Sequence, residues 1–86
     1  MPDPVNPTGP TPASAAAAVE RVIAWYSREI DRERRAVAPD EKRLEHLKVA
    51  LRASAADQRK LEDADAQEAD RIAVHYAALH EELMES

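Results

Sequence analysis

The side chains with the most chemical potential in this sequence are three histidines, His46, His75 and His80. A helical zinc site typically uses two histidines four residues apart, whereas His75 and His80 are five apart. At about 100° per residue, that spacing places the two rings roughly 140° apart around a helix. No Glu-x-x-His sequence occurs, so the di-iron pattern of helical bundles is also missing. The histidines therefore predict no metal site.

Carboxylates are the second group with catalytic potential, and they cluster at residues 62–65 and 81–85. General acid–base catalysis requires burial or a specific neighbour that shifts the carboxyl pKa. On an exposed helix these carboxylates are solvated, so we expect them to have no catalytic role. The single glycine, Gly9, excludes a glycine-rich phosphate loop. We therefore expect a non-enzymatic protein with no catalytic residues and no cofactor.

The composition indicates one small domain with a weak core. The chain has 86 residues, its aromatic content is 3 %, and nearly half of its apolar residues, which make up 44 % of the chain, are alanine. A core of this size is marginal, and small proteins compensate with disulfides, metals or oligomerisation. The sequence has no cysteine, which leaves no disulfides and no thiolate metal sites. Oligomerisation is therefore the expected source of additional stability.

A long amphipathic stretch, residues 40–84, must position any functional side chain. At about 100° per residue, its large apolar residues fall within an arc of roughly 120°. No Gly or Pro interrupts the stretch. This apolar stripe contains Leu44, Leu47, Leu51, Leu61, Ile72, Tyr76, Leu79 and Leu83, with Ala55 and Ala69. The pattern predicts one continuous helix, or two helices that join in phase.

A shorter helix is predicted over residues 13–37, after a proline that suits the first helical position. Pro39 ends this helix, because proline lacks an N–H and disfavours the α region for the residue before it. So short a connection to the next helix predicts an antiparallel helical hairpin. One apolar face of the shorter helix is expected to contain Val19, Ile23, Tyr26, Ile30 and Val37. The predicted fold class is therefore all-α.

The two predicted helices differ in length, at about 36 Å and about 67 Å. The shorter helix reaches only to about Asp63, so apolar side chains beyond it should lack a partner within the chain. We expect this overhang to pack on a second copy, giving a homodimer with coiled-coil or four-helix packing. The alternative is a monomeric three-helix bundle with a turn near residues 62–65, where Asp65 and Glu68 resemble a capping box.

The predicted function is a small interaction module, an adaptor or regulator that associates with itself or with a helix of another protein. Trp25 lies off the main apolar face and suits a binding anchor, since Trp is enriched at hot spots. The predicted partner-binding residues are Trp25, Ala69, Ile72, Tyr76, Leu79 and Leu83. A ligand site in a monomeric three-helix bundle is an alternative function.

The charge distribution argues against general binding to a phosphate backbone. The net charge is −5, and residues 57–86 contain nine acidic and three basic side chains. The predicted hairpin tip collects half of the twelve Lys and Arg side chains, interleaved with acidic ones. These are Arg28, Arg32, Arg34, Arg35, Lys42 and Arg43. A nucleic-acid-associated regulator that uses this tip is a further alternative.

Residues 1–12 hold five of the six prolines and the only glycine, which predicts a disordered tail before a helical domain at 13–86. No apolar run approaches the ~20 residues needed to span a membrane. The N-terminus also lacks the basic and apolar regions of a secretory signal. We therefore expect a cytoplasmic protein, and the Ala, Arg and Asp bias is typical of a GC-rich bacterial genome.

Overall fold

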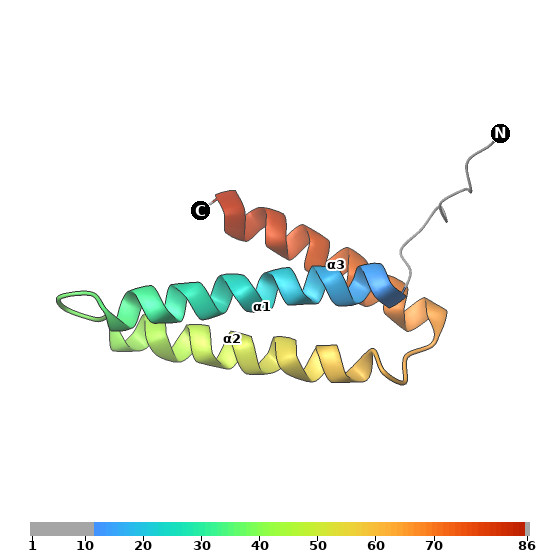
Figure 1. Ribbon diagram of the computed structural model, residues 1–86, viewed down its shortest axis with the longest axis horizontal. Coiled ribbons are helices and arrows are strands. Elements are labelled where there is room, and N and C mark those ends of the chain that lie inside the picture. The colour runs from blue at the N-terminus through green and yellow to red at the C-terminus, as the bar shows by residue number, and fades with distance from the viewer. Residues whose placement is uncertain (1–11, 86) are drawn as a thin grey trace.

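The computed structural model describes residues 12–85, with side chains from Ser14 onward, and these residues form three helices and no strand (Figure 1). The helices are α1 (Pro12–Arg34), α2 (Glu41–Lys60) and α3 (Ala66–Glu85). Both α2 and α3 pack against α1, whereas they make few contacts with each other. The all-α prediction is confirmed. Residues 1–11 of the predicted tail lie outside the described residues.

The central helix, α1, begins at Pro12, where a missing N–H costs little because the first helical N–H has no partner within the helix. Its alanines at 15–18 favour the helix and allow close approach by a neighbour. Together with the partly buried Ile23 and Trp25, the buried residues of α1 span roughly 160° of the helix surface. They are Ala15, Ala18, Val19, Val22, Tyr26 and Ile30. An apolar surface this wide serves two neighbours.

The connection from α1 to α2 is short, and the two helices run antiparallel (Figure 1). The N–H groups of Lys42 and Arg43 donate to Oδ1 of Asp40 at 3.0 and 3.1 Å, so Asp40 caps α2. The N–H of Asp40 donates to Oε2 of Glu33 at 2.9 Å. Because α1 ends before residue 35, Val37 lies outside the helix with a fully exposed side chain. The prediction that Val37 belongs to the apolar face is therefore wrong.

A turn at residues 61–65 separates α2 from α3, so the prediction of one continuous helix over 40–84 is wrong. The predicted alternative, a three-helix arrangement with a turn near 62–65, describes the chain. The N–H groups of residues 61–64 each donate to the carbonyl three residues earlier, at 3.1–3.4 Å, which tightens the end of α2. The N–H of Glu68 then donates to Oδ1 of Asp65 at 2.8 Å and starts α3, as the capping-box pattern predicts.

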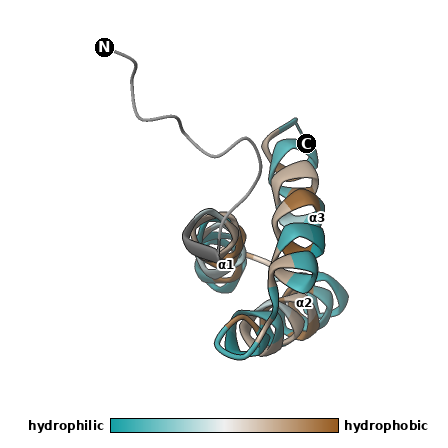
Figure 2. Cartoon of the chain, turned by 90° about the vertical axis from the view of Figure 1, so that its right-hand side faces the viewer, coloured by the Kyte–Doolittle hydropathy of each residue, from teal (hydrophilic) through white to brown (hydrophobic). Residues whose placement is uncertain are grey.

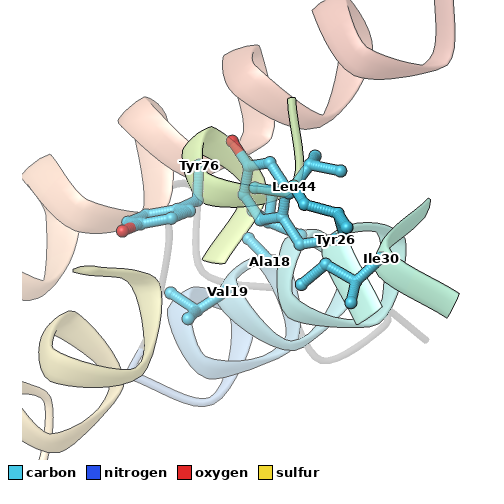
Figure 3. Packing of buried hydrophobic residues seen from close by; sticks show 8 residues of the cluster. Ala18, Val19, Tyr26, Ile30, Leu44 and Tyr76 are labelled. Carbon is cyan, nitrogen blue, oxygen red and sulfur yellow. The ribbon is translucent and has the colours of Figure 1, made fainter. Parts of the chain in front are cut away.

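The folding back of α3 gives its apolar residues a partner within the chain. Figure 2 shows α3 rising beside α1, at an angle to α2. Ala69, Ala73 and Tyr76 are buried, and Tyr76 belongs to the same cluster as Val19 of α1 (Figure 3). The expectation that the side chains beyond Asp63 are uncovered in a single chain is therefore wrong. The reason is that the alanine-rich half of α1 offers α3 a second packing surface, which the expectation did not include.

The principal dimensions of the domain are 57 × 28 × 15 Å, so it is elongated and flat. Its two fully buried larger side chains, Val19 and Val22, both lie on α1. Around them the core draws Leu44 and Leu47 from α2 and Tyr76 from α3. Within residues 12–85, none of the helices has the length and apolar character needed to cross a membrane.

Candidate interaction groove

An open groove lies between the C-terminal end of α3 and the hairpin of α1 and α2. Figure 1 shows that this end of α3 diverges from α1. It has a volume of about 950 Å³. All three helices contribute apolar side chains to its walls. These are Trp25, Tyr26, Leu47, Ala50, Leu83 and Met84. We call this feature the α3 groove.

Two adjacent aromatic residues of α1 form one wall of the α3 groove. The rings of Trp25 and Tyr26 meet edge to face, with centroids 5.5 Å apart and planes at 82°. Tyr26 is a core residue, and burial raises the pKa of its phenol. Trp25 is only partly buried, and Met84, also in the groove lining, is 62 % exposed. The groove therefore presents part of the Trp25 ring and the flexible thioether of Met84 to solvent.

The rim of the α3 groove is polar and braced by ion pairs. The guanidinium of Arg43 lies 3.1 Å from Glu29 and 3.3 Å from Glu33, which joins α2 to α1. Arg32 lies 3.3 Å from the same Glu29, whose side chain is only 14 % exposed. Burial of a charged carboxylate to this extent is unfavourable unless it is paired with cations, and Glu29 is paired with Arg32 and Arg43. The rim residues are Glu29, Arg32, Asp40, Lys42, Arg43 and His46.

A hydrogen bond outside the groove lining connects α3 to α2. The hydroxyl of Tyr76 donates to Oδ2 of Asp57 at 2.5 Å. Burial of the phenol, and to a lesser extent this hydrogen bond, raises the pKa of Tyr76 to about 12. The ring of His75 meets that of Tyr76 edge to face, with centroids 5.0 Å apart. Nearby on α2, the buried Ser54 donates its hydroxyl to the carbonyl of Ala50 at 3.0 Å. Tyr76 therefore has a structural role in fixing α3.

The predicted partner-binding residues divide into two groups. Trp25 and Leu83 both line the α3 groove. The other four lie away from it: Ala69 and Tyr76 are buried, and Ile72 and Leu79 pack beside the core. Sequence reasoning missed four apolar lining residues, namely Tyr26, Leu47, Ala50 and Met84. No pattern in the sequence marks them as a group, because the groove depends on the angle at which α3 leaves α1.

The histidines occupy separate environments. His46 lies on the groove rim, whereas His75 contacts Tyr76 on α3. Among residues 12–85, no three side chains of His, Asp or Glu are arranged to hold a metal ion. Comparison of the chain with protein families, with characterised proteins and with solved structures finds no match.

Proposed function

We propose that this protein is a small non-enzymatic interaction module, an adaptor or regulator, whose α3 groove binds an amphipathic helix of another protein. The observation that supports the proposal is the open groove of about 950 Å³ between the end of α3 and the hairpin, to which all three helices contribute apolar side chains. Amphipathic helices bind such grooves through apolar side chains spaced three, four and seven residues apart. Trp25 and Met84 are the residues expected to contact them first.

The polar groups of the groove favour a protein ligand over a small molecule. Its volume is within the range of small-molecule sites, but those sites typically bury a few convergent polar groups that orient the ligand. Here the polar lining residues form an exposed rim, and the most sheltered of them, Glu29, is already paired with two arginines. An apolar floor inside a polar rim is typical of protein interfaces.

The charges of the rim suggest the character of the partner helix. Of the three cations around the groove, Arg32 and Arg43 are paired with Glu29 and Glu33, whereas Lys42 makes no ion pair among the residues that the structure describes. An acidic side chain beside the apolar face of the partner would complement Lys42 and raise the association rate. The proposed partner is therefore an amphipathic helix with large apolar residues on one face and a carboxylate at its edge.

The titratable groups also support a non-enzymatic role. Catalytic acids and bases typically lie in clefts and have pKa values shifted by burial and neighbouring charges. In the part of the chain that the structure describes, the clear pKa shifts are those of Tyr26 and Tyr76, raised chiefly by burial in the core. Neither phenol is paired with a base in the groove, so binding is the better supported activity.

Site-specific photo-crosslinking in the cells that express the chain tests this proposal. A photoreactive benzoylphenylalanine at Met84 samples the groove, and the same residue at Val74 is the matched control. Both positions are exposed on α3, at 62 % and 59 %, but Val74 does not line the groove. We expect an adduct from position 84 whose linked peptide has an amphipathic helical pattern. No adduct from position 84, or an equal one from position 74, would contradict the proposal.

A further inference from the structure

The turn between α2 and α3 begins with near-helical geometry and contains no residue that prevents a helix. Residues 61–65 contain no Gly or Pro, and no residue in 12–85 has a positive φ. Leu61 has φ −64° and ψ −21°, which is helical. The i→i+3 hydrogen bonds continue as far as the N–H of Ala64. The short segment of residues 61–65 is therefore the part that must change to α-helical geometry for α2 and α3 to merge.

The apolar stripe keeps its phase across this turn, although a turn does not require that. The Leu, Ile and Tyr residues from Leu44 to Leu83 lie within roughly 120° when plotted as one helix, with Val49 and Val74 outside this arc. The two halves of the stripe also pack on the same helix, α1. In a straight α2–α3 helix, both halves would face one side. There each half would be available to the α1 of a different copy.

We propose that two copies of this chain exchange α3. Residues 61–65 become helical, α2 and α3 merge into one helix over residues 41–85, and each α3 packs on the α1 of the other copy. The merged helix would be about 67 Å long. Exchange of an identical element is a low-cost route to a dimer, because the contacts of the monomer are re-formed between copies.

The contacts of α3 are well suited to this exchange. Its packing is almost entirely with α1, and its hydrogen bond to α2 runs from Tyr76 to Asp57. In the exchanged dimer, Tyr76 of each copy would donate to Asp57 of the other. The cap that Asp65 provides for α3 is lost, but backbone hydrogen bonds of the merged helix replace it. The exchange depends on the turn, so its test is separate from that of the α3 groove.

The variant Ala66→Pro distinguishes the two states of the turn. Ala66 is the first residue of α3, a position that tolerates proline, and Asp65 before it is the capping residue. Inside a merged helix the same proline would remove a hydrogen bond and clash with the carbonyl of Glu62. Ala66→Ser is the matched control, since serine is compatible with both states.

Light scattering from low micromolar to millimolar concentration, after prolonged incubation, measures the outcome. We expect the wild type and Ala66→Ser to form dimers, and Ala66→Pro to remain monomeric with unchanged helicity. A wild type that is monomeric throughout would overturn the proposal. So would an Ala66→Pro variant that dimerises as well as the wild type, since its dimer would then need no merged helix.

An intrachain distance gives a second readout that does not depend on proline. Val49 and Val74 are exposed and the chain has no cysteine, so spin labels on Val49→Cys and Val74→Cys report on α2 and α3. In a merged helix these positions are about 38 Å apart. In doubly labelled chains diluted with unlabelled protein, we expect this distance in the dimer fraction and a shorter one in the monomer. A dimer that keeps the shorter distance would overturn the exchange.

Discussion

The hydroxyl of Tyr76 donates to Oδ2 of Asp57 at 2.5 Å and so connects α3 to α2. The two helices otherwise make few contacts, because each packs on α1. This hydrogen bond is therefore a specific polar constraint on the orientation of α3 relative to the hairpin. That orientation determines where the end of α3 leaves α1, and hence where the α3 groove opens.

Removal of the Tyr76 hydroxyl should destabilise the fold measurably. We expect Tyr76→Phe to lower the free energy of unfolding by about 1–2 kcal/mol, since a hydrogen bond to a carboxylate is lost while Asp57 keeps partial contact with water. Urea denaturation measures the change. Tyr26→Phe is the matched control, because the hydroxyl of Tyr26 has no hydrogen-bond partner among residues 12–85. Equal destabilisation by the two variants would contradict the assigned role.

Stability should fall in alkaline solution. Burial raises the pKa of Tyr76 from 10.0 to about 12, so the folded chain holds this proton more tightly than the unfolded chain. The resulting stabilisation is fully present below about pH 10 and is lost as the pH rises towards 12. We expect the free energy of unfolding to decrease over this interval, with a smaller decrease in Tyr76→Phe. Urea titrations at several alkaline pH values test this, and parallel pH profiles for the two proteins would contradict it.

The central position of α1 can be tested through its buried valines. Val22 is fully buried, and Val22→Ala should cost about 1–3 kcal/mol through lost apolar burial and a residual cavity. Val74→Ala removes the same atoms from an exposed position on α3 and should change stability by less than about 0.5 kcal/mol. Thermal or urea unfolding of both variants provides the comparison. Similar losses from the two substitutions would place Val22 outside the core.

Much of the fold could be predicted from the sequence, because it depends on local chemistry. Pro12 and Asp40 indicate where α1 and α2 begin, and helical periodicity identifies the core positions Leu44 and Leu47. The turn before α3 was assigned only as an alternative, because i→i+3 tightening and an aspartate cap need no Gly or Pro. An apolar stripe that keeps its helical phase is compatible with one continuous helix and also with two helices that pack on the same neighbour.

The candidate site was less predictable than the fold. Trp25 and Leu83 were predicted to bind a partner and do line the groove, but Tyr76 was assigned to the same surface and is buried in the core. Ala15 and Ala18 of α1 are buried contact residues, but their small side chains do not mark this part of α1 as a packing surface in the sequence. The groove itself depends on the angle between α1 and α3, which no local pattern encodes.

The most direct measurement of the proposed binding role is the affinity of wild type and Trp25→Ala for the partner segment recovered by crosslinking at position 84. Calorimetry gives the affinity, and circular dichroism verifies that helicity is retained. Trp25 is the expected aromatic anchor of the α3 groove, so its truncation to alanine should weaken binding at least tenfold, which corresponds to about 1.4 kcal/mol of binding free energy. An unchanged affinity in a folded Trp25→Ala variant would contradict the assignment of the groove as the binding site.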